Sequence, residues 1–113
     1  MQTQQAWNLD GVKEELKALI RIPSVTGGES AISQHIFARL KQIGADYVEK
    51  QVVEEGRYNI VARIQGASPG KRILLTGHMD TVAPGDGWTT KPFEPVERDG
   101  KIFGRGANDM KAG

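Results

Sequence analysis

The chain has 113 residues, carries 15 Lys and Arg against 14 Asp and Glu, and contains no Cys. This length fits one domain and excludes two well-packed ones, and the absence of Cys excludes disulfides and thiolate metal sites. A formal net charge of +1, with no long apolar run and no signal-peptide pattern, predicts a cytoplasmic protein without nucleic-acid or membrane partners.

Two amphipathic helices are predicted in the first part of the chain. Apolar side chains recur at i, i+3 and i+4 spacing over residues 8–21 and again over residues 30–43. Asn8 fits the N-cap position of the first helix, and Trp7 is placed to pack against its first turns. Gly44 fits the position at which the second helix ends.

The pattern then changes to strands. Residues 47–53 and 58–64 are rich in β-branched and aromatic side chains and are joined by a Gly-containing turn. Residues 72–76 carry Ile-Leu-Leu without alternation, which predicts a strand buried on both faces of an α/β sheet. A hairpin is predicted over residues 96–103 because Asp99-Gly100 suits a type I′ turn. This order of elements indicates an α/β or mixed sheet.

Three features that resemble functional motifs have simpler interpretations. Residues 66–71 lack the spacing of a phosphate-binding loop and are better explained as a turn. Residues 104–106 begin like a dinucleotide-binding motif, but Asp109 occupies the position of its third glycine. His35 lies at the edge of an apolar helix stripe and is interpreted as a partly solvated surface histidine.

His78, Asp80 and Asp109 are the candidate site residues. His78 and Asp80 follow the predicted buried strand, where ligands bind in open α/β sheets, and residues two apart in extended backbone point to the same side. Asp80 is therefore placed to orient the imidazole, although a surface His–Asp pair has the same spacing. Asp109 follows a Gly-rich loop and has two oxygens for metal ions, with helix N-capping as its alternative role.

Three blocks of this sequence resemble the zinc aminoacylase family. This family includes acetylornithine deacetylases, succinyl-diaminopimelate desuccinylases, aminoacylases and small-peptide peptidases. The blocks are residues 75–82 (LTGHMDTV), 87–93 (GWTTKPF) and 104–113 (GRGANDMKAG), in family order and at family spacing. The resemblance implies that residues 1–113 are the truncated N-terminal portion of a three-layer α/β/α catalytic domain with a mixed sheet, without the lid or dimerisation domain.

The same resemblance implies roles for individual residues. His78 would bind one zinc ion, Asp109 would bridge two, and Asp80 would be a catalytic-site carboxylate that orients the His78 region. A cis peptide often follows the bridging aspartate in this family, here Asp109–Met110. Cobalt or manganese could occupy the same nitrogen and oxygen ligands. The family's general-base Glu and remaining ligands have no counterpart in these 113 residues.

The leading hypothesis is a metal-dependent hydrolase of amide bonds in N-acyl amino acids or small peptides, inactive as this fragment alone. One alternative is a truncated non-catalytic α/β module that acts in binding or assembly, and another is an unrelated α/β domain. Because a partial sheet leaves apolar surface and strand edges open, we expect either a piece of a longer enzyme or edge-to-edge pairing in a homo-oligomer. A helix is expected to begin near Met110.

Overall fold

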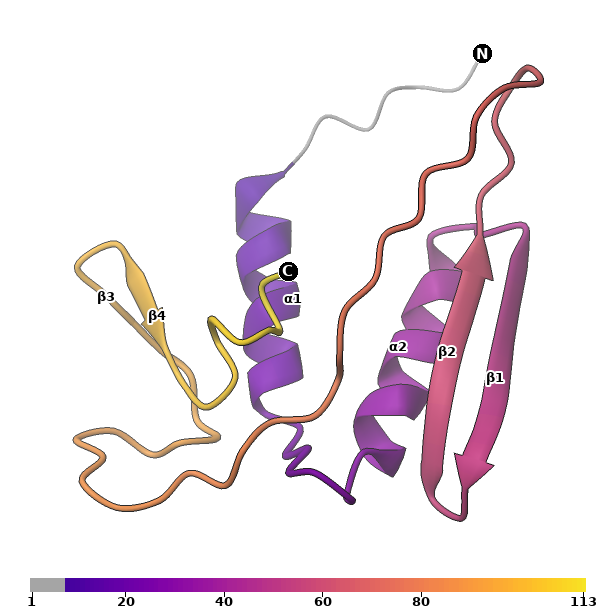
Figure 1. Ribbon diagram of the computed structural model, residues 1–113. Coiled ribbons are helices and arrows are strands. Elements are labelled where there is room, and N and C mark those ends of the chain that lie inside the picture. Colours follow the sequence, from indigo (N-terminus) through magenta and orange to yellow (C-terminus); the bar gives the residue numbers. More distant parts are fainter. Residues whose placement is uncertain (1–7) are drawn as a thin grey trace.

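The computed structural model describes residues 8–113, which form two helices, two β-hairpins and long extended connections (Figure 1). The helices and strands are α1 (Leu9–Ile20), α2 (Ser30–Gln42), β1 (Tyr47–Glu54), β2 (Arg57–Arg63), β3 (Val96–Arg98) and β4 (Lys101–Phe103). Each hairpin is a separate antiparallel two-stranded sheet, so the described residues are a small mixed α/β unit. None of its helices is long and apolar enough to cross a membrane within residues 8–113.

Both predicted helices are confirmed, together with their end signals. The Asn8 side chain accepts a hydrogen bond from the Asp10 backbone N–H at 3.0 Å, as an N-cap residue does. Gly44 has a φ of +84° just after α2, a conformation that glycine adopts at little cost. The predicted contact of Trp7 lies outside the described residues.

The β1–β2 hairpin packs against α2, as Figure 1 shows. Lys50 on β1 places its ammonium 5.4 Å from the ring centre of Phe37 on α2 and 4.8 Å from that of Tyr58 on β2. Arg57 at the start of β2 forms a bidentate ion pair with buried Glu29, the residue just before α2. The antiparallel pairing of β1 with β2 confirms the predicted hairpin. Cation–π and ionic contacts hold this hairpin to α2 and to the residue before it.

The second hairpin lies beside α1. Asp99 and Gly100 have φ angles of +53° and +71°, which confirms the predicted turn. Glu97 on β3 forms ion pairs with Lys13 and Lys17 of α1, with an N–O distance of 2.8 Å to each lysine. These contacts connect the C-terminal third of the chain to its first helix.

The prediction of a buried strand over residues 72–76 is wrong for this structure. The segment is extended but belongs to no sheet, and Ile73, Leu74 and Leu75 are 88%, 86% and 89% exposed. A strand is buried only when neighbouring strands and covering helices lie on it, and the described residues place none at its edges. The expected exposure of apolar surface is confirmed.

The helix expected near Met110 is also absent from the described residues. Residues 105–112 form successive turns, with backbone hydrogen bonds from Lys111 to Gly106 and from Gly113 to Met110. A helical hydrogen bond joins residues four apart, and the four residues 110–113 contain no such pair.

Candidate metal site

The loop between α1 and α2 supports the segment that carries His78 and Asp80. Val25 and Thr81 form a parallel β-bridge, in which Thr81 N–H donates to the Ser24 carbonyl at 2.8 Å and Thr26 N–H donates to the Thr81 carbonyl at 3.0 Å. The fully buried Ser24 also donates its hydroxyl to the Met79 carbonyl at 2.8 Å. The backbone after residue 78 is thus fixed by the loop rather than by a sheet.

The structure brings His78, Asp80 and Asp109 together, as the sequence predicts. His78 Nε2 lies 2.9 Å from Asp109 Oδ1, across 31 residues of sequence. On the other side of the ring, His78 Nδ1 lies 3.0 Å from the Asp80 backbone oxygen and 3.2 Å from Asp80 Oδ1. The imidazole therefore has an acceptor group at each nitrogen.

The charges at this site stabilise one another. The Asp80 backbone carbonyl, followed by the Asp109 carboxylate, raises the pKa of His78. The Thr26 hydroxyl, which donates to Asp80 Oδ2 at 2.6 Å, is the main cause of the lowered pKa of Asp80. The arrangement favours a protonated imidazole between two carboxylates, and a metal ion would compete with the proton at Nε2.

The donor set fits a metal ion only in part. With its proton on Nδ1, the neutral His78 ring presents the Nε2 lone pair on the side where Asp109 lies, and this nitrogen–oxygen pair suits zinc, cobalt or manganese. Asp80 lies at the opposite nitrogen, Nδ1, and orients the ring rather than offering a ligand on the Nε2 side. No group of three His, Cys, Asp or Glu suited to a metal ion occurs among residues 8–113. The described part of the chain therefore offers two ligands and one orienting carboxylate.

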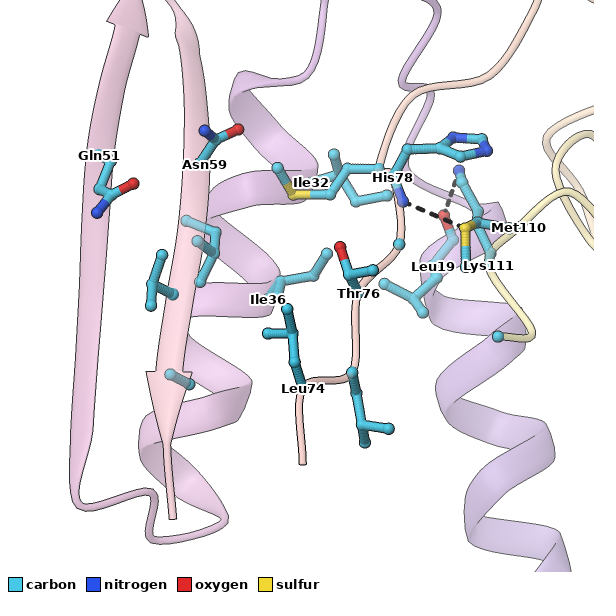
Figure 2. A pocket seen from close by; sticks show the side chains of 17 residues that line it. Leu19, Ile32, Ile36, Gln51, Asn59, Leu74, Thr76, His78, Met110 and Lys111 are labelled. Atoms are coloured by element: carbon cyan, nitrogen blue, oxygen red, sulfur yellow. Dashed lines mark hydrogen bonds between the residues drawn. The ribbon is translucent and has the colours of Figure 1, made fainter. Parts of the chain in front are cut away.

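Met110 joins the two segments that carry the predicted ligands. Its sulfur accepts a hydrogen bond from the His78 backbone N–H at 3.2 Å. Its methyl group lies 2.5 Å from the position that a Cβ at Gly77 would occupy, so a side chain there would collide with it. Figure 2 shows the Met110 side chain beside His78. The Asp109–Met110 peptide bond is cis, as the family resemblance implies.

Lys111 makes a second set of contacts, which the sequence does not predict. Its ammonium donates at 2.8 Å to the carbonyl oxygen of Leu19 in the last turn of α1, as Figure 2 shows, and at 2.8 Å to that of Ile22 just after the helix. Lys111 is 9% exposed, and burial lowers its pKa to about 8. The lysine thereby holds the segment containing Asp109 to the first helix, although the partners are 89 or more residues away in sequence.

A cavity of about 620 Å³ lies next to the site, between α2, β2, residues 74–79 and the C-terminal turns (Figure 2). Its lining is mixed, with Ile32, Ile36 and Leu74 on the apolar side and Asn59 and His78 among its polar groups. By contrast, the other histidine is not part of it. His35 Nε2 contacts Glu15 Oε1 at 2.8 Å, and its side chain is 31% exposed, which confirms its partly solvated position.

Comparison with known proteins gives concordant results. Residues 74–113, which contain all three candidate site residues, match the family described as Peptidase family M20/M25/M40. The chain is 36% identical over 97 residues to the succinyl-diaminopimelate desuccinylase of a Nitratiruptor species, covering 86% of this chain and 25% of that relative. It is 39% identical over 102 residues to that of Erythrobacter litoralis, covering 84% of this chain and 27% of the relative. The chain thus spans about a quarter of the length of these relatives.

Proposed function

We propose, on the premise that residues 74–113 of this chain belong to peptidase family M20/M25/M40, that the chain forms part of the metal centre of a metal-dependent amide hydrolase. The observation that carries the proposal is the approach of His78 Nε2 to Asp109 Oδ1 at 2.9 Å, with Asp80 behind the ring. A histidine whose second nitrogen contacts a carboxylate is the usual form of a metal-ligating imidazole.

His78 and Asp109 would hold zinc, and Asp109 has a second oxygen with which to bridge to another zinc ion. Asp80 would orient His78 by accepting a hydrogen bond from its Nδ1–H. A bound zinc ion supplies Lewis acidity, which polarises an amide carbonyl and lowers the pKa of water. Cobalt or manganese would suit the same donor atoms.

The remaining parts of the proposed site are not in this sequence. Catalytic zinc takes three protein ligands, and residues 8–113 offer two that approach each other. We therefore propose that the 113-residue chain alone has no turnover, and that its mixed α/β unit is the N-terminal portion of a three-layer catalytic domain.

The substrate class follows from the relatives and is part of the same proposal. Those relatives are named succinyl-diaminopimelate desuccinylases, so the substrate proposed here is a small N-acyl amino acid or peptide with an amide bond. We propose a cytoplasmic location. The alternative function, a module that acts in assembly, is favoured by one observation, the exposed apolar residues 73–75, which offer an edge for homo-oligomer formation.

Equilibrium dialysis with zinc tests the proposal. The variants are His78→Ala and Asp109→Ala, with His35→Ala as the matched control because that ring pairs with Glu15 rather than with a candidate site residue. We expect the wild type and the control to retain zinc alike, and each site variant to bind at least about tenfold more weakly. Equal retention of zinc by all four chains would refute the proposed metal site.

A further inference from the structure

We propose that Thr26 is a positioning residue of the candidate metal site. Its hydroxyl fixes the Asp80 carboxylate so that the proton of the neutral His78 ring stays on Nδ1, which leaves Nε2 free for a metal ion. This inference rests on the proposed function, since it concerns the same site. Thr26 comes from the α1–α2 loop, outside every sequence block that resembles the family.

The contacts form a continuous chain across 54 residues of sequence. Thr26 Oγ1 donates to Asp80 Oδ2 at 2.6 Å. The second oxygen of the same carboxylate, Oδ1, lies 3.2 Å from His78 Nδ1. Because each oxygen has its own partner, rotation of the carboxylate would break one contact to change the other. The threonine hydroxyl therefore selects the carboxylate orientation that faces the imidazole.

The main contacts that place the loop do not use the Thr26 hydroxyl. The Thr26 backbone N–H donates to the Thr81 carbonyl, and Val25 forms the β-bridge to Thr81. Ser24 binds the Met79 carbonyl through its own hydroxyl. Replacing threonine with valine keeps the shape and these contacts. It removes the donor to Asp80 at 2.6 Å and the longer contact of the same hydroxyl with the Thr81 carbonyl at 3.3 Å, whereas the backbone hydrogen bond to that carbonyl remains.

The position of the ring proton depends on a competition between two sides of His78. The Asp109 carboxylate, which is 83% exposed, favours the proton on Nε2. Asp80 attracts it to Nδ1 with its backbone oxygen and with a carboxylate that is 32% exposed. Hydrogen bonds weaken steeply when their geometry is lost. If the Asp80 carboxylate were free to rotate, a larger fraction of the neutral His78 ring would therefore carry its proton on Nε2. A protonated Nε2 has no lone pair for a metal ion.

The test compares Thr26→Val with Thr26→Ser, which keeps the hydroxyl, and with Thr89→Val, the same chemical change at an exposed position. Zinc affinity is measured by competition with a chromophoric chelator. The tautomer of His78 is measured without metal from the ring nitrogen resonances, at a pH at which the ring is neutral. Partners outside the ligands themselves change metal affinity by about 10- to 100-fold, and Thr26 lies one contact further out.

We therefore expect Thr26→Val to bind zinc about three- to tenfold more weakly and to raise the fraction of ring protonated on Nε2 at least about twofold, while Thr26→Ser and Thr89→Val match the wild type. An unchanged affinity and tautomer in a folded Thr26→Val, or a Thr26→Ser as weak as Thr26→Val, would overturn the inference. Thr26→Ala is read by the same criteria if the valine variant does not fold. Loss of zinc with His78→Ala but not with Thr26→Val would overturn this inference alone, whereas His78→Ala binding like wild type would overturn the proposed function and this inference with it.

Discussion

Replacement of Lys111 by methionine is expected to loosen the attachment of the C-terminal turns to α1. Methionine keeps most of the aliphatic volume but removes two hydrogen bonds of 2.8 Å, from the ammonium to the carbonyls of Leu19 and Ile22. Hydrogen bonds to a charged group contribute about 1.5–3 kcal/mol each. Against this, lowering the pKa of Lys111 from 10.5 to about 8 by burial corresponds to a cost of up to about 3 kcal/mol in the wild type.

The two hydrogen bonds together contribute about 3–6 kcal/mol, so subtracting the burial cost leaves a net destabilisation centred on about 1.5 kcal/mol for Lys111→Met, or roughly 6 °C in Tm. The assay is thermal unfolding followed by far-UV circular dichroism at pH 7, with exposed Lys101→Met as the control. The dependence on pH supplies a second readout. Between pH of about 8 and 10.5 the unfolded chain binds more protons at Lys111 than the folded chain, so the free energy of unfolding of the wild type should rise with pH relative to Lys111→Met. A Lys111→Met chain as stable as Lys101→Met, with the same pH slope as wild type, would refute this reasoning.

Three further predictions concern the hairpin, the packing at the site and the ligand. Hydrogen bonds from Lys13 and Lys17 lower the pKa of Glu97 from 4.5 to about 2. The stabilisation from these contacts is therefore present above about pH 4.5 and is lost as the pH falls towards 2. Glu97→Gln should reduce this loss of the free energy of unfolding at acidic pH, as measured by urea unfolding at several pH values. Gly77→Ala places a methyl group against Met110, so zinc affinity by dialysis should fall severalfold, and unchanged affinity would contradict the packing described. Zinc at 100 times its Kd should raise the free energy of unfolding by about 2.7 kcal/mol, and should leave the His78→Ala chain unchanged.

Local patterns were sufficient to predict the elements whose partners are close in sequence. The i, i+3 and i+4 spacing predicted α1 and α2, and Asp99-Gly100 predicted the β3–β4 hairpin. The strand predicted over residues 72–76 failed because burial of an apolar segment depends on strands and helices that lie elsewhere. In this structure no strand lies on either edge of that segment among residues 8–113.

The candidate site was predictable for a different reason. His78, Asp80 and Asp109 are chemically distinctive and stand in sequence blocks that resemble a family, and the structure places them within contact distance. The residues that hold them are ordinary ones. Thr26 and Lys111 act through contacts to partners 54 and 89 or more residues away, and neither spacing nor residue type indicates such contacts.

The central claim is that His78 and Asp109 bind the same metal ion while Asp80 holds the opposite side of the ring. The most direct measurement is a zinc titration of the isotope-labelled chain, in which the ring nitrogens of both histidines and the aspartate carboxyl carbons are followed by NMR. We predict that the His78 Nε2 and Asp109 carboxyl resonances shift together and saturate at the same zinc concentration, that the proton remains on His78 Nδ1, and that His35 stays unchanged. Zinc-dependent shifts at His35 instead, or at His78 without Asp109, would contradict the account.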